Sequence, residues 1–181
     1  MPGCEGSYPQ LIDNLSMEIE NLERNRVCSK RKSIPPYQVF FTWDIHYACN
    51  YKCSYCILKE EWDALSKKNR YPGINKWIEI WDSIYRKYGS CRLHISGGEP
   101  FVYPSFLELI AHLAEKHTLT FDTNLSLDVF SFTKKIKPER VRFAATFHPE
   151  FTELASYLER VKHLKENGFE IIVDYVAYPP N

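Results

Sequence analysis

The sequence predicts an α/β fold made of parallel strand–helix units, preceded by a separate N-terminal segment. From residue 37 onward, short apolar segments rich in β-branched and aromatic residues alternate with longer segments whose apolar residues recur at helical spacing. This alternation is typical of parallel sheets whose strands are joined by crossover helices. Five strands with four crossovers would form an open sheet or a partial barrel rather than a closed eight-stranded barrel.

Composition narrows the class of protein. Of the 181 residues, 44% are hydrophobic and 25% are charged, which is ordinary for a globular domain with its own core. Lys and Arg number 23, and so do Asp and Glu, so the neutral chain has no overall basic footprint for nucleic acid. Apolar runs fall short of the roughly 20 residues that a bilayer span needs, and the N-terminus lacks a signal-peptide pattern. We therefore expect a cytoplasmic protein that binds neither nucleic acid nor membrane.

Two regions are expected along the chain. Residues 1–36 form a predicted N-terminal extension, with a short amphipathic helix over residues 10–25 and two prolines at positions 35 and 36 that end any helix. Residues 37–181 form the predicted core domain, which ends without a sixth strand. We interpret this ending as a fragment of a longer protein, with a split protein and a degenerate copy as alternatives.

The elements of the core domain follow from local patterns. Strands are predicted where apolar and β-branched residues cluster, over Val39–Ile45, Arg92–Ser96, Leu119–Thr123, Val141–Phe147 and Glu170–Ala177. Helices are predicted where one face is apolar, over Asn75–Tyr88, Ser105–His117, Asp128–Ile136 and Thr152–Asn167. Ser105 and Glu108 predict a capping box, Thr152 predicts a second N-cap, and Gly168 predicts the end of the last helix.

Two motifs follow the first two strands. The loop over residues 46–60 holds Cys49, Cys53 and Cys56 in a C-x3-C-x2-C spacing, and Gly97-Gly98-Glu99-Pro100 follows the second strand. Because the carboxyl ends of parallel strands meet at one edge of a sheet, we expect the two motifs to lie on the same edge, and side by side if the two strands are neighbours.

Three cysteines on one polar loop indicate an inorganic centre rather than buried thiols in a core. Structural zinc sites take four ligands, and Cys91 or His46 are candidates for the fourth. A redox pair would use C-x2-C alone and leave Cys49 without a role. A four-iron cluster usually takes four cysteines, so three would leave one iron open to another ligand.

Together the two motifs resemble those of the radical SAM superfamily, whose cluster loop has the form C-x3-C-x2-C with an aromatic residue, here Tyr55, before the third cysteine. The resemblance runs from about Val39 to Ala177. It implies an incomplete (β/α)6 partial TIM barrel in which Cys49, Cys53 and Cys56 ligate a [4Fe-4S] cluster. It also implies that the open iron binds S-adenosylmethionine (SAM), which is cleaved to a 5′-deoxyadenosyl radical that abstracts hydrogen from a substrate.

The resemblance implies further cofactor-binding residues at the strand ends. Gly97 and Gly98 would present backbone groups to the SAM ammonium, Glu99 would add charge or fix the turn, and Pro100 would stiffen it. Tyr55 would lie by the adenine. Weaker candidates are Asn124, which equally suits a turn, Thr146, and His148, which suits a structural role somewhat better.

The same resemblance implies partner proteins. An electron donor such as flavodoxin or ferredoxin is expected, and a second chain that completes the barrel is possible in a split protein. The substrate and the catalytic residues stay unassigned because a fold does not select a substrate. The alternative function is a non-catalytic module that holds zinc or an iron–sulfur cluster.

Overall fold

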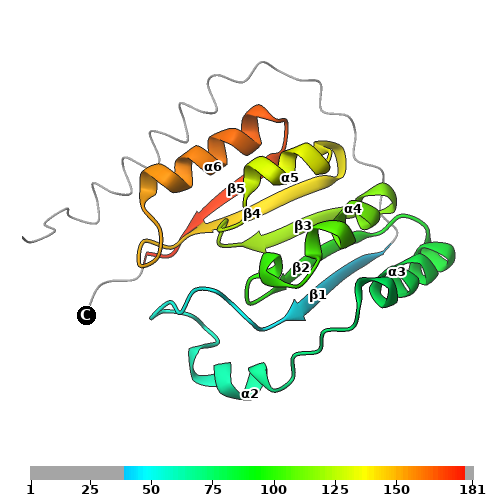
Figure 1. Cartoon of the computed structure of the whole chain (residues 1–181), viewed down its shortest axis with the longest axis horizontal. Coiled ribbons are helices and arrows are strands. Elements are labelled where there is room, and N and C mark those ends of the chain that lie inside the picture. The colour runs from blue at the N-terminus through cyan, green and yellow to red at the C-terminus, as the bar shows by residue number, and fades with distance from the viewer. Residues whose placement is uncertain (1–38, 178–181) are drawn as a thin grey trace, which may run out of the picture. The chain divides into compact units, whose positions relative to one another are not determined.

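The computed structural model describes residues 39–177, so the predicted extension over 1–36 and its helix lie outside the described residues. The core is a five-stranded, fully parallel sheet in the order β1-β2-β3-β4-β5 (Figure 1). Its strands are β1 (Phe40–His46), β2 (Arg92–Gly97), β3 (Thr118–Thr123), β4 (Val141–Phe147) and β5 (Glu170–Tyr175). The predicted α/β class and the parallel sheet are confirmed.

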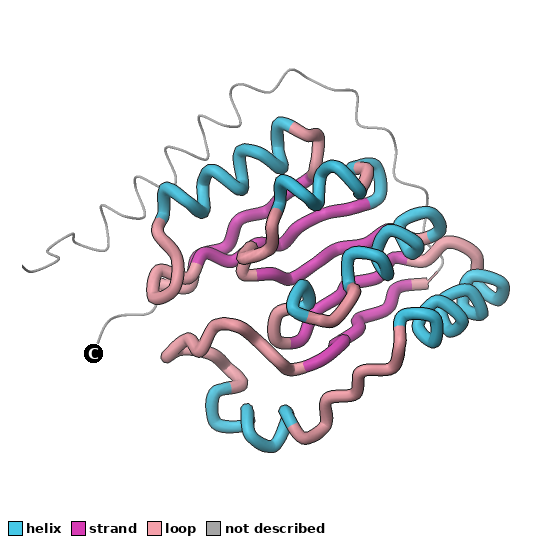
Figure 2. The backbone as a smooth tube through the Cα atoms, in the orientation of Figure 1, coloured by secondary structure: helices cyan, strands magenta, loops and turns pink. Residues whose placement is uncertain are grey.

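Four crossover helices cover one face of this sheet (Figure 2). They are α3 (Ile74–Tyr88), α4 (Phe106–Lys116), α5 (Val129–Lys135) and α6 (Leu154–Glu166). A short helix α2 (Trp62–Ser66) and three 3-10 turns, η1 (Lys59–Glu61), η2 (Pro100–Val102) and η3 (Pro138–Arg140), were not predicted. Within the described residues, no helix is both long and apolar enough to cross a bilayer.

The hydrophobic core lies between the sheet and these helices. In the three central strands, the residues that point to the helix side are almost fully buried, among them Leu93, Ile95, Leu119, Phe121, Val141 and Phe143. An aromatic cluster from β3, β4, α4, α5 and the turn after β2 fills the middle, with ring centroids 5.1–5.8 Å apart for Phe101 against Phe106, Phe121 and Phe132. Burying side chains of this size stabilises the fold by about 2 kcal/mol each.

The other face of the sheet is polar and open. Side chains alternate along each strand, so Arg142, Ala144 and Thr146 face away from the buried Phe143 and Ala145. Two cross-strand pairs lie on this face: His94 Nε2 is 2.7 Å from Asp122 Oδ1, and Arg142 Nε is 3.1 Å from Glu170 Oε2. One covered face and one open face are what a partial barrel requires.

Two of the predicted helix caps are wrong. Ser105 adopts a left-handed conformation with φ of 55° and makes no side-chain cap hydrogen bond, because it ends a turn rather than entering the helix from an extended backbone. Glu153 rather than Thr152 precedes α6, and the Thr152 Oγ1 instead accepts a 3.5 Å hydrogen bond from the Tyr51 hydroxyl. Helix α6 does stop just before Gly168, as predicted.

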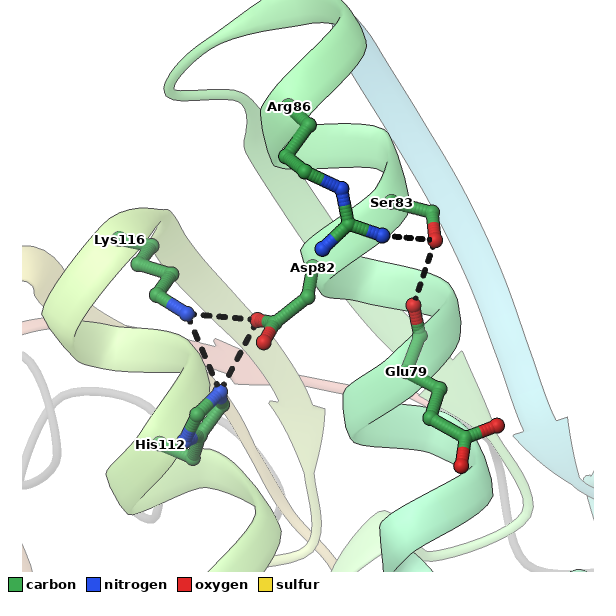
Figure 3. Close-up of polar contacts among 6 residues, drawn as sticks. All are labelled: Glu79, Asp82, Ser83, Arg86, His112 and Lys116. Carbon is green, nitrogen blue, oxygen red and sulfur yellow. Dashed lines mark hydrogen bonds and ion pairs between the residues drawn. The ribbon is translucent and has the colours of Figure 1, made fainter.

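A charged clamp joins helices α3 and α4 on the outer surface (Figure 3). Asp82 Oδ1 accepts hydrogen bonds from Lys116 Nζ at 2.7 Å and from His112 Nε2 at 3.0 Å. These two donors hold the pKa of Asp82 below its usual range. About a quarter of each side chain is exposed, so solvent screens the clamp only in part.

Removal of the clamp is expected to destabilise the domain. We predict that Asp82→Ala lowers the free energy of unfolding by about 1 kcal/mol, because it removes a partly buried, charge-assisted pair of hydrogen bonds. The matched control is Glu79→Ala on the same helix, whose pairing with Lys76 is mostly exposed and should contribute less than about 0.5 kcal/mol. Urea unfolding measures both, and equal effects would contradict a special role for Asp82.

Candidate functional site

The predicted site residues gather at the carboxyl edge of the sheet, where all five strands end. The cysteine loop follows β1, the Gly97–Pro100 turn follows β2, and Asn124 directly follows β3. Thr146 lies near the end of β4, and His148 directly follows that strand. The parallel arrangement thus puts both motifs on the edge that the sequence predicted.

Backbone hydrogen bonds join the cysteine loop to the Gly97–Pro100 turn. The Gly98 amide donates to the His46 carbonyl at 2.9 Å, and the Glu99 amide donates to the Ala48 carbonyl at 2.9 Å. The Nε2 atom of His46 lies 2.9 Å from the Glu99 carbonyl oxygen. These contacts extend the β1–β2 pairing past the ends of the two strands and fix the start of the cysteine loop.

Both glycines are required by this close approach. Gly97 has φ of 123°, which residues with a side chain rarely adopt. An added Cβ at Gly97 would overlap the carbonyl oxygen of His46, and one at Gly98 would overlap the carbonyl oxygen of Ala48. The glycines therefore allow the turn to lie directly against the segment that leads into the first cysteine.

Glu99 is a fully buried carboxylate that ties this turn to the end of β3. It accepts hydrogen bonds from the Thr123 hydroxyl at 2.9 Å, from the Asn124 amide at 2.7 Å and from the Phe101 amide at 3.1 Å. Burial raises its pKa to about 7, although these donors favour the ionised form. Of the two roles considered for Glu99, the contacts match the one that fixes the turn.

The three loop cysteines are free thiols on one short loop. Cys53 is buried, whereas Cys49 and Cys56 are half-buried. Burial raises the pKa of Cys49, and it raises the pKa of Cys53 to about 11. The charges of Cys49 and Cys56 add to the rise in the pKa of Cys53.

This donor set fits an iron–sulfur cluster. Thiolates are the ligands of such clusters, and a bound metal centre supplies the positive charge that stabilises buried thiolates. Among residues 39–177, no three His, Cys, Asp or Glu side chains are grouped so as to hold a single metal ion.

The proposed fourth zinc ligands lie elsewhere, so this part of the sequence interpretation is wrong. Cys91 is fully buried just before β2, at the opposite edge of the sheet, and its amide pairs with His117. His46 turns its Nε2 toward the backbone of Glu99 and packs edge-on against Tyr71 and Tyr103.

Asn124 links the end of β3 to the cysteine loop. Its Nδ2 donates to Asn50 Oδ1 at 2.9 Å and lies 3.9 Å from the sulfur of Cys49. Its Oδ1 accepts from the Ser126 amide at 2.9 Å, which forms the turn after β3. Asn124 therefore serves the turn and the loop together, and its partner Asn50 was not singled out from the sequence.

The segment after β4 braces the middle of the cysteine loop. Glu150 accepts hydrogen bonds from the Ser54 amide at 2.8 Å and from the Ser54 hydroxyl. These bonds lower the pKa of Glu150. The ring of His148 stacks on Tyr55 beside Cys53. No local pattern marks Glu150, which sequence reasoning missed. Thr146 lies on the open face of β4, and no hydrogen bond joins it to the loop among the described residues.

Comparison with known proteins finds a family model that spans both motifs. The sequence model of the Radical SAM superfamily matches residues 43–180. Mycofactocin maturase MftC from Mycobacterium ulcerans (strain Agy99) is 32% identical over 90 residues, which cover 48% of this chain and 22% of that protein. The MftC of Mycobacterium tuberculosis (strain H37Rv) matches to the same degree and is covered over 21% of its length.

Two solved structures share the fold. Streptococcus suis SuiB bound to precursor peptide SuiA superposes with a TM-score of 0.62 at 18% identity, over 99% of this chain and 40% of that one. Native anSMEcpe with bound AdoMet gives a TM-score of 0.52 at 18% identity, over 75% of this chain and 43% of that one. The chain thus spans less than half the length of each of these relatives.

Substitution of Gly98 should separate the turn from the cysteine loop. We predict that Gly98→Ala lowers the free energy of unfolding by about 2–4 kcal/mol, because the added Cβ meets backbone atoms that cannot move cheaply. Gly73→Ala is the matched control, since nothing lies within 4 Å of its added Cβ. Chemical denaturation compares the two variants, and a neutral Gly98→Ala would refute the close packing.

Burial of Glu99 predicts an unusual pH dependence in the metal-free protein. Its pKa rises from 4.5 to about 7 on folding, so the folded state binds the extra proton between these values. Stability from this group is complete below about pH 4.5 and is lost as the pH rises through 7, by about 3 kcal/mol in total. Wild type should therefore exceed Glu99→Gln in stability by more at pH 5 than at pH 8. A difference that stays constant with pH in urea unfolding would exclude this titration.

Proposed function

The chain belongs to the radical SAM superfamily, and we propose that it binds a [4Fe-4S] cluster through Cys49, Cys53 and Cys56 and cleaves SAM reductively. One observation carries the proposal: the cysteine loop and the glycine turn pack backbone to backbone at one edge of the sheet. A structural metal site would need no such turn, whereas a bound amino acid group needs close access to backbone atoms.

Three thiolates leave one iron of the cluster open, and we propose that this iron binds SAM. Gly97 and Gly98 would present backbone groups to the ligand, with Glu99 and Pro100 holding the turn in shape. Asn124 stands beside Cys49 and would border the same position. Tyr55, His148 and Thr146 are proposed to line the cofactor side of the site, Thr146 from the open face of β4.

The bound groups supply the chemistry, namely one-electron cleavage of SAM to methionine and a 5′-deoxyadenosyl radical that abstracts hydrogen from a substrate. The protein holds the cluster loop, orients the cofactor and limits access of water. Radical SAM enzymes need a reductant, and we propose a flavodoxin or a ferredoxin for this role.

The substrate side of the barrel extends beyond the described sheet in our proposal. Strand β5 pairs with β4 alone among the described residues, and Ile172 on its open face is 61% exposed. We propose that a further segment or a second chain pairs with the outer edge of β5, since an uncovered edge strand invites pairing. We also propose that residues 37–181 form the core domain and that residues 1–36 form an extension to it.

Cluster binding gives the direct test. We predict that anaerobic reconstitution with iron and sulfide loads about four irons per chain, and that reductant plus SAM then releases 5′-deoxyadenosine. Cys53→Ala should lose both the iron and the SAM cleavage, because the cluster would keep only two protein ligands. Iron analysis and chromatography of the products measure the two outcomes.

The control variant is Cys91→Ala, a buried thiol at the opposite edge of the sheet that should keep full iron loading. Stoichiometric zinc without SAM cleavage would instead identify a non-catalytic metal module and refute the proposal.

A further inference from the structure

The sulfur of Cys53 has two side-chain neighbours that carry hydrogen-bonding groups. The Nδ1 atom of His148 lies 3.4 Å from the Cys53 sulfur and 3.0 Å from the Tyr55 hydroxyl oxygen. The rings of Tyr55 and His148 stack with centroids 5.8 Å apart and planes 9° apart. Cys53 itself is only 6% exposed, so these contacts lie in a largely dry environment.

Tyr55 stands beside the same sulfur. Its hydroxyl oxygen lies 3.0 Å from the Nδ1 atom of His148, the same atom that lies 3.4 Å from the Cys53 sulfur. A phenol hydroxyl carries one proton that it can donate to a sulfur. His148 and Tyr55 thus form a pair of neighbours around one sulfur.

The position of His148 is fixed from several sides. Tyr51 meets its ring edge-on with centroids 5.9 Å apart, and Tyr51 in turn stacks on Phe151 at 4.8 Å. The His148 carbonyl accepts from the amides of Phe151 and Thr152 at 3.0 and 3.1 Å. The imidazole is therefore held in place before any cluster binds, which favours a defined hydrogen bond over a transient contact.

The other two cysteines have different surroundings. Cys49 accepts a backbone hydrogen bond from the Tyr51 amide at 3.4 Å and has the Asn124 amide group 3.9 Å away. For Cys56, no side-chain donor contacts the sulfur among the described residues. Cys53 alone has an imidazole and a phenol beside its sulfur, so the three corners of a cluster would be chemically unequal.

We propose that His148 and Tyr55 are positioning residues that donate hydrogen bonds to the Cys53 sulfur and so raise the reduction potential of the cluster. The inference rests on the proposed function, because it needs Cys53 to be a cluster ligand. An iron-bound thiolate only accepts, so Nδ1 of His148 carries its proton toward the sulfur and the Tyr55 hydroxyl donates alongside it. Hydrogen bonds to sulfur stabilise the more negative, reduced cluster.

The test is an EPR-monitored redox titration of the reconstituted chain without SAM. His148→Phe keeps a stacked ring but removes the donor, and Tyr55→Phe removes only the hydroxyl. Each should lower the midpoint potential, so that the ratio of reduced to oxidised cluster at a given solution potential falls about tenfold, or about 59 mV for one electron. His148→Asn retains an N–H donor and should stay near the wild-type potential.

Matched controls separate this effect from general disturbance. His163→Phe on α6 and Tyr85→Phe on α3 make the same chemical changes away from the cysteine loop and should leave the potential unchanged. If His148→Phe binds no iron, the midpoint potentials of His148→Asn and Tyr55→Phe test the inference in its place. Fully loaded His148→Phe and Tyr55→Phe with wild-type potentials would overturn this inference alone. A wild-type chain that takes up no cluster would overturn the proposed function and this inference with it.

Discussion

The site depends on the contact between the loop after β1 and the turn after β2. Parallel pairing brings these two backbones together, and the missing side chains of Gly97 and Gly98 let them approach to hydrogen-bonding distance. Without that approach, the segment leading to Cys49 would have no fixed start. This pairing positions the first residues of the cysteine loop. The other contacts at the carboxyl edge then hold the rest of the loop in place.

Two networks, one buried and one partly exposed, extend the contact across the sheet. Glu99 links the turn after β2 to the end of β3, because its carboxylate accepts hydrogen bonds from the Thr123 hydroxyl and the Asn124 amide. This link requires a buried carboxylate. Glu150 and His148, which follow β4, contact Ser54 and Cys53 in the middle of the cysteine loop. Four neighbouring strands thus hold one short loop, which agrees with the need of a metal centre for ligands oriented by a surrounding shell.

The two faces of the sheet differ: one is apolar and covered by helices, and the other is open and polar. Helices lie over the apolar face of the sheet (Figure 1), whereas the pairs His94–Asp122 and Arg142–Glu170 lie on the opposite face. The family relationship and the fold agree on this layout, although the chain spans less than half of each relative compared.

The sequence alone determined the parallel strand–helix units and placed the thiol loop and the glycine turn after the first two strands, at one edge of the sheet, because alternating strand and helix patterns leave a parallel sheet as the consistent fold. It could not determine that Glu99 accepts hydrogen bonds from Thr123 and Asn124, that Ser105 makes no cap hydrogen bond, or that Glu150, Asn50 and His148 contact the loop and the residues beside it. The contacts of Asn50, His148 and Glu150 join residues 74 to 96 positions apart, where local patterns carry no signal. Only the side-by-side order β1-β2-β3-β4 in the folded sheet decides which side chains reach the cysteines.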